Sequence, residues 1–205
     1  MQNLKFIRNG FVVLSILTTA SAYSGSQLDV DEMSNIFGEF QGSDELGLLE
    51  DLVLSPGNYA EVTLTSTSNS HVAIGQVRKG NGTNKAKVIQ DGAHSSTAIV
   101  TQIGSSNTAL VEQSGENNIA VLEQTGRYHT GYISQDGNNN LAYLNQCSGR
   151  FCLGNEGSEI SISQANDNNV AIVLDKSNAS YGIEQSGNDF IFIRNSMNRS
   201  IYVEQ

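Results

Sequence analysis

Apolar and polar residues alternate in short segments along residues 70–205, and most of these segments end at a glutamine. The best copies, 107–113, 118–124 and 140–146, share the pattern Asn-x-Ala-x-Val/Leu-x-Gln. A period of two residues predicts a β-strand. Twelve strands are expected, with their last inward residues at Gln76, Gln90, Gln102, Gln113, Gln124, Gln135, Gln146, Gln164, Asp175, Gln185, Asn195 and Gln205.

Short segments rich in Gly, Asn and Ser separate these strands. Stretches such as "SGEN", "DGNN" and "SGND" predict turns, because Gly and Asn tolerate positive φ. Two strands and two turns make a coil of about 22 residues, so twelve strands make about six coils. The sequence therefore predicts an all-β fold, a parallel two-sheet β-solenoid of the cross-β, amyloid-like kind. The insertions "RKGNGTN" and "CSGRFCLGNEG" fall in its turns.

The inward amides of such a solenoid are expected to form ladders. In a parallel stack the same side chain recurs at the strand spacing of about 4.8 Å, so each amide N–H can reach the carbonyl of the next rung. Ala, Val, Leu and Ile would fill the thin space between the sheets. The predicted ladder residues are Gln76, Gln90, Gln102, Gln113, Gln124, Gln135, Gln146, Gln164, Gln185, Gln205, Asn84, Asn107, Asn118, Asn140 and Asn169.

The outward positions of the two predicted sheets differ in polarity. Eleven of eighteen are apolar on one sheet and four of eighteen on the other. The apolar docking face comprises Ile99, Ile119, Val121, Leu141, Tyr143, Val170, Ile172, Leu174, Phe190 and Phe192. A face of this size predicts a partner: another filament, an outer-membrane surface or secretion-linked factor, or the chain's own leader. The alternative is that these residues only raise strand propensity.

The residues before the repeat divide into two segments. Lys5 and Arg8, an apolar run over 11–17 and a small-x-small site at 20–22 predict a secretory signal peptide over residues 1–22. Residues 23–69 form an acidic leader, expected to be partly disordered or amphipathic, and residues 70–205 form the solenoid. The leader carries apolar residues at roughly helical spacing, which would suit a cover for the apolar face: Met33, Ile36, Phe37, Phe40, Leu46, Leu49, Leu52 and Val53.

Charge and composition exclude several functions. The formal net charge is −10 and no basic stripe with aromatics is present, so nucleic acid is not an expected partner. His71, His94 and His129 are scattered, and no clustered carboxylate pair suggests acid/base chemistry. No catalytic residue, metal site or cofactor is predicted, and the protein is not expected to be an enzyme. Cys147 and Cys152 would close a small disulfide loop in an oxidising exterior, or remain two free thiols.

The pattern Gln-x-Gly-x-x-Asn-x-Ala-x-x-x-Gln is complete at 102–113, 113–124 and 135–146, and this resembles the curlin repeat. The resemblance implies an extracellular functional amyloid of Gram-negative biofilms. It also implies export through the outer-membrane curli secretion pore with accessory factors, and self-association into fibres at the cell surface.

The curlin family has a major fibre-forming subunit and a minor subunit that nucleates the fibre. Here Asp175 and Asn195 replace glutamine, and Arg194 and Arg199 enter the last coil. A divergent, arginine-bearing final repeat is similar to the minor subunit. The nucleator, with the major subunit as its partner, is therefore the favoured interpretation. The major subunit itself and a non-amyloid adhesive β-solenoid are the alternatives.

Overall fold

The structure is a computed structural model that describes residues 2–7, 11–15, 44–51, 57–147, 157–196 and 202–205. Within these residues it contains one helix, α2 (Asp44–Asp51), and fifteen strands. The strands are β1 (Gln2–Ile7), β2 (Phe11–Ser15), β3 (Asn58–Thr65), β4 (His71–Arg78), β5 (Asn84–Asp91), β6 (Thr97–Ser105), β7 (Thr108–Ser114), β8 (Ile119–Arg127), β9 (Thr130–Asp136), β10 (Leu141–Cys147), β11 (Glu159–Ala165), β12 (Val170–Asp175), β13 (Ser180–Gln185), β14 (Phe190–Asn195) and β15 (Tyr202–Glu204).

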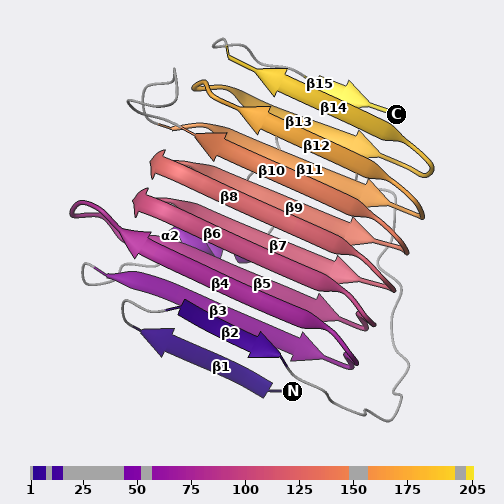
Figure 1. Ribbon diagram of the computed structural model, residues 1–205, viewed down its shortest axis with the longest axis horizontal. Coiled ribbons are helices and arrows are strands. Elements are labelled where there is room, and N and C mark those ends of the chain that lie inside the picture. Colours follow the sequence, from indigo (N-terminus) through magenta and orange to yellow (C-terminus); the bar gives the residue numbers. More distant parts are fainter. Residues whose placement is uncertain (1, 8–10, 16–43, 52–56, 148–156, 197–201) are drawn as a thin grey trace.

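The strands form two layered sheets that the chain visits alternately (Figure 1). The eight-stranded sheet has the order β1-β3-β5-β7-β9-β11-β13-β15, and the seven-stranded sheet has the order β14-β12-β10-β8-β6-β4-β2. From β3 onward every neighbouring pair is parallel and in register, with Gln102 beside Gln124 and Gln124 beside Gln146. The predicted parallel two-sheet β-solenoid of about six coils is thereby confirmed.

The core is a thin apolar column between the sheets. It is built from the inward Ala and Val/Leu/Ile positions of the repeat, such as Ala120 and Leu122, which are fully buried. Because these side chains are small or branched, the sheets approach closely and each rung repeats the contacts of its neighbour.

The turns stack as regularly as the strands. Asn117 and Asn139 have φ values of 57° and 58°, a conformation that Asn adopts more readily than most residues. Gly104 and Gly126 also have positive φ and lie one above the other. A Cβ built on Gly104 would lie 1.7 Å from the Gly126 carbonyl oxygen, so only glycine fits there.

The parallel stack begins before residue 70, where the glutamine alignment placed its start. β3 pairs in register with β5, from Asn58 beside Asn84 to Thr65 beside Asp91. Its inward residues follow the repeat except that Leu64 occupies the glutamine position, which is why a search anchored on glutamine missed it. The N-terminal strand β1 pairs antiparallel with the outer edge of β3, and β2 pairs antiparallel with the outer edge of β4.

Candidate functional site

The glutamines of each sheet form a directional ladder. In the eight-stranded sheet the Nε2 of Gln90 donates to the Oε1 of Gln113 at 2.8 Å, and the same bond joins Gln113 to Gln135, Gln135 to Gln164 and Gln164 to Gln185 at 2.8–2.9 Å. In the seven-stranded sheet the ladder runs from Gln76 through Gln102 and Gln124 to Gln146 at 2.6–2.9 Å. Every donor points toward the C-terminal rungs.

Most of these amides also donate to the opposite sheet. Gln102 Nε2 donates to the Lys85 carbonyl at 2.9 Å, and Gln124 Nε2 donates to the Thr108 carbonyl at 2.8 Å. One amide therefore joins two rungs of its own sheet and ties that sheet to the other. The alternation of residues predicted the ladder but not this cross-sheet bond, which depends on the length of the glutamine side chain.

The predicted asparagines lie at the starts of the strands, where they hold the turns. Asn118 Nδ2 donates to the Ser114 and Gly137 carbonyls, both at 2.7 Å, while its Oδ1 accepts the backbone N–H of Asn140 at 3.0 Å. Corresponding turn or rung contacts are made by Asn84, Asn107, Asn140 and Asn169. The asparagine amide thus satisfies turn carbonyls that would otherwise be buried without a donor.

The ladder of the seven-stranded sheet is interrupted after Gln146. The next residue in the column is Asp175, which is buried and accepts a hydrogen bond from Ser177 Oγ at 2.6 Å. Asn195 continues the column and donates to Ser177 Oγ at 3.0 Å. Burial raises the pKa of the Asp175 carboxyl, since few waters can solvate its charge.

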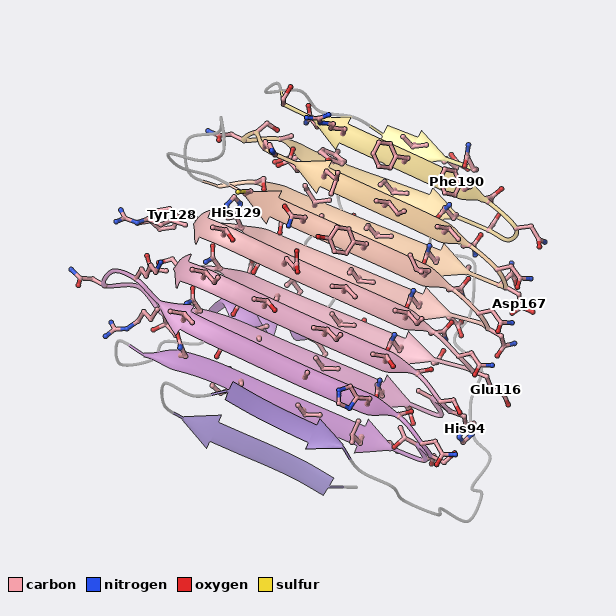
Figure 2. The ribbon with its side chains drawn as sticks, in the orientation of Figure 1. His94, Glu116, Tyr128, His129, Asp167 and Phe190 are labelled. Carbon is pink, nitrogen blue, oxygen red and sulfur yellow. The ribbon has the colours of Figure 1, made fainter. Side chains whose placement is uncertain are left out.

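His129 occupies an asparagine position of the repeat and is fully buried. Its Nε2–H donates to the Thr125 carbonyl at 3.2 Å, and its Nδ1 accepts from Ser158 Oγ at 2.9 Å. Burial lowers the pKa of His129 to about 4, so the ring is neutral at pH 7. Figure 2 places it, with Tyr128, at one turn edge of the solenoid, opposite His94, Glu116 and Asp167.

The predicted apolar docking face lies on the seven-stranded sheet. Phe190, Phe192 and Ile119 are 65%, 54% and 42% exposed, and the labelled Phe190 is visible in Figure 2. The remaining predicted members are partly exposed: Ile99, Val121, Leu141, Tyr143, Val170, Ile172 and Leu174. Glu123 lies among them and accepts hydrogen bonds from Tyr143 and Asn145 at 2.6 and 2.8 Å.

The leader helix α2 lies on the eight-stranded sheet. The suggestion that the leader covers the apolar docking face is therefore wrong for α2. This helix contacts β5 and β7. Leu46 and Leu49 are buried there, and the outward Leu110 of β7 is fully buried. Met33, Ile36, Phe37, Phe40, Leu52 and Val53 lie outside the described residues.

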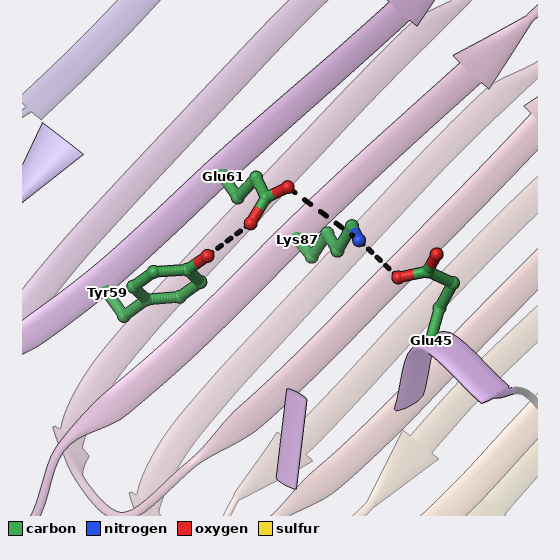
Figure 3. Close-up of polar contacts among 4 residues, drawn as sticks. All are labelled: Glu45, Tyr59, Glu61 and Lys87. Carbon is green, nitrogen blue, oxygen red and sulfur yellow. Dashed lines mark hydrogen bonds and ion pairs between the residues drawn. The ribbon is translucent and has the colours of Figure 1, made fainter. Parts of the chain in front are cut away.

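Charged contacts fix the helix in place. Lys87 bridges Glu45 of α2 and Glu61 of β3, and Tyr59 donates to Glu61 (Figure 3). Near the C-terminal end of the helix, Thr130 Oγ1 of β9 donates to Glu50 at 2.9 Å. The helix therefore packs on the sheet that carries Lys87 and Leu110, and not on the sheet with more apolar surface.

Other predicted residues are placed less completely. Gln205 is exposed beside Gln185, with its backbone N–H donating to the Glu184 carbonyl at 3.2 Å. Cys147 is disulfide-bonded, while Cys152 lies outside the described residues, so the pairing itself stays a prediction.

In the described part of the chain no three His, Cys, Asp or Glu side chains gather as metal ligands would. The helix found there is not one that could span a bilayer.

Comparison with known proteins finds a similarity in the central rungs. Two overlapping segments, residues 93–126 and 115–147, match the family model of the curlin associated repeat. No curated protein and no solved structure matches the chain. The matched residues contain β6 to β10 and five of the ladder glutamines: Gln102, Gln113, Gln124, Gln135 and Gln146. These rungs are similar to curlin repeats, and the match supports a relationship of the chain to the curlin family.

Proposed function

We propose that the chain is a secreted curli-type amyloid subunit that nucleates fibre growth at a Gram-negative cell surface. The observation that carries the proposal is the in-register parallel stack, which in the described residues reaches β14 and β15 and is held by an amide ladder in each sheet. Among the described residues each of these strands is paired on one side only. Unpaired backbone N–H and C=O groups on an edge strand template the addition of another strand.

The departures of the later rungs from the repeat support a nucleator over a major subunit. Asp175 and Asn195 stand where the column would have glutamine, and the burial of Asp175 disfavours its charged form. A subunit used once for each fibre tolerates such rungs better than one whose junctions recur along the whole fibre. The five-glutamine ladder of the eight-stranded sheet, by contrast, would suit a major subunit equally well.

Polymerisation of the purified chain, alone and with a major curlin subunit, tests the proposal. A nucleator at substoichiometric dose shortens the lag of the major subunit in a thioflavin assay. Long fibres formed by the chain alone would instead identify a major subunit, and a persistently soluble monomer would identify a non-amyloid adhesive solenoid.

Attachment to the cell surface is assigned in this proposal to the apolar docking face. Its aromatic end, Phe190 and Phe192, is well exposed, whereas the opposite sheet is partly covered by α2. Contiguous apolar surface of this kind on a soluble protein marks an interaction site more often than ordinary surface.

A further inference from the structure

The two turn edges of the solenoid carry charges of opposite sign. The turns that follow β4, β8 and β12 form the basic turn edge, whose described bases are Arg78, Lys79, Arg127 and Lys176. The turns that follow β5, β7, β9, β11 and β13 contain no Lys or Arg and form the acidic turn edge, with Asp91, Glu116, Asp136, Asp167 and Asp189. Figure 2 shows Tyr128 at the basic turn edge, opposite Glu116 and Asp167.

Most of these charges are accessible to solvent. The exposed members are Lys79 and Arg127 on one edge, and Asp91, Glu116, Asp136 and Asp167 on the other. Hydrogen bonds hold two of the carboxylates in place: Asp136 Oδ1 accepts from Ser114 Oγ at 2.5 Å, and Asp167 Oδ1 accepts from the backbone and side-chain N–H groups of Asn138 at 2.7 and 3.1 Å. Carboxylates fixed in this way lose little conformational freedom when they pair with a cation.

The two turn edges are too far apart to neutralise each other within one molecule. A strand of seven residues such as β9 is about 23 Å long, at about 3.3 Å per residue. This length is well above the screening length of about 8 Å at physiological ionic strength. The attraction between the edges therefore acts between molecules, and a second copy of the chain supplies the complementary edge.

The spacing of the charges suits a side-by-side contact between parallel copies. The acidic turn edge carries a carboxylate in every coil from β5 to β14, and neighbouring coils are about 4.8 Å apart. The bases after β4, β8 and β12 recur in every second coil, about 10 Å apart. A base that faces the acidic turn edge thus has a carboxylate within about 2.4 Å along the stack, so the contact does not depend on one axial register.

We propose that copies of this chain associate side by side, with the basic turn edge of one copy against the acidic turn edge of the next. Because the two edges lie on opposite sides, each contact leaves one edge of each kind open, and the association builds rows instead of closed dimers. The inference goes beyond the proposed function, since it requires neither strand addition at the ends nor the apolar docking face. Exposed ion pairs are individually weak, so the rows are reversible and sensitive to salt.

The salt dependence of the mass in solution is the first test. The formal net charge is −10, so copies repel one another on average, and added salt weakens this repulsion. Pairing of opposite edges has the reverse dependence. Sedimentation of freshly purified, thioflavin-negative secreted chain is measured at about 0.1 M and about 1 M salt, where the screening length falls from about 10 Å to about 3 Å.

The association constant should fall roughly 10-fold or more at the higher salt concentration. A chain that is monomeric at both salt concentrations, or that associates more strongly at the higher one, overturns the inference. Stronger association at high salt would indicate contact through apolar surface instead.

Two charge-reversed variants connect the association to the turn edges. The first carries the three substitutions Lys79→Glu, Arg127→Glu and Lys176→Glu, and the second carries Glu116→Lys, Asp136→Lys and Asp167→Lys. Each variant alone should have an association constant roughly 10-fold or more below that of the wild type, because like charges then face each other. Their net charges change in opposite directions, so a general charge effect does not lower both constants.

An equimolar mixture of the two variants should associate again, since the reversed edge of one matches the reversed edge of the other. Circular dichroism of each variant first establishes that the solenoid is folded. Folded variants that associate as the wild type does, or a mixture that does not associate, overturn the inference. Failure of the wild type to seed a major curlin subunit would overturn the proposed nucleation alone, because the side-by-side contact does not involve the ends of the stack.

Discussion

At the scale of single residues, the glutamine position combines burial with nearly complete hydrogen bonding. Gln124 accepts from Gln102 and donates to Gln146 and to the Thr108 carbonyl, although it is fully buried. A shorter amide would not reach the opposite sheet, and an apolar side chain would leave its neighbours unpaired. The repeat thus offsets the free-energy cost of burying a column of amides, since each rung supplies a hydrogen-bond partner to the next.

Gln124→Leu should lower the free energy of unfolding by about 3 kcal/mol or more, because Gln102 loses its acceptor and the Thr108 carbonyl loses a donor. Urea denaturation of freshly purified chain, followed by circular dichroism, measures the change. Gln205→Leu is the matched control, because Gln205 is exposed, and it should change the unfolding free energy by less than about 0.5 kcal/mol. Equal losses for both variants would contradict the ladder's contribution.

His129 predicts an acid-sensitive stability. The folded pKa is about 4, below the ordinary 6.5, so the unfolded chain binds the proton more readily. The contribution of the neutral ring is complete above pH 6.5 and is lost as pH falls toward 4, by on the order of 3 kcal/mol.

His129→Asn restores the residue of the repeat and should remove this loss. The measurement is the difference in unfolding free energy between wild type and variant at pH 7 and pH 4.5. The carboxyls of Asp175, Glu112 and Glu159, whose pKa values burial raises, act with the opposite sign but are common to both proteins. A difference that does not change with pH would show that His129 does not titrate in this range.

At the scale of elements, the strands of the repeat could be predicted from the sequence because each rung contains the residues that determine its register. Alternation separates inward from outward side chains, and the fixed amide column fixes the pairing. The strand β3 escaped because Leu64 breaks the glutamine pattern, although Asn58, Ala60 and Val62 keep the rest of it. A search on the Asn-x-Ala-x-Val half of the motif would have found it.

The position of α2 could not be predicted, because its contacts join residues far apart in the chain. Amphipathicity indicated that the helix has an apolar side but not which sheet receives it. Lys87 and Leu110 decide the matter, and both occupy outward positions of the less apolar sheet, where the alternation of residues does not indicate a binding site.

Leu49→Ala should loosen α2 without unfolding the solenoid. Leu49 is buried against the sheet, so its truncation costs about 2 kcal/mol or more of docking energy. Leu48→Ala is the control, because Leu48 is 67% exposed on the same helix. Hydrogen exchange should accelerate in α2 for Leu49→Ala alone, while β7 to β10 remain protected; equal exchange in both variants would mean that the helix is not held by its buried side.

At the scale of the whole molecule, the solenoid is a thin ribbon with two unlike faces and two unlike ends (Figure 1). The ends govern what can be added along the stack, and the faces govern what the stack can lie against. Backbone pairing at the ends is independent of the outward side chains, so variants should separate assembly from attachment.

Charging the apolar docking face should separate these two activities. Ile119→Lys with Ile172→Lys is expected to abolish attachment of the protein to the bacterial surface while thioflavin-positive assembly continues, since both side chains point away from the core. Thr63→Lys with Ser134→Lys, on the outward side of the opposite sheet, is the control. Retained attachment in the Ile119/Ile172 variant would favour the simpler view that these residues only raise strand propensity.

The placement of α2 on one face bears on how thick a fibre can become. Two ribbons that bury their apolar docking faces against each other leave outward only the sides that carry the helix and its ion pairs. A third ribbon would then meet a face with few exposed apolar side chains among the described residues. In the proposed fibre, lateral growth through the apolar docking face is therefore expected to stop at a pair of ribbons.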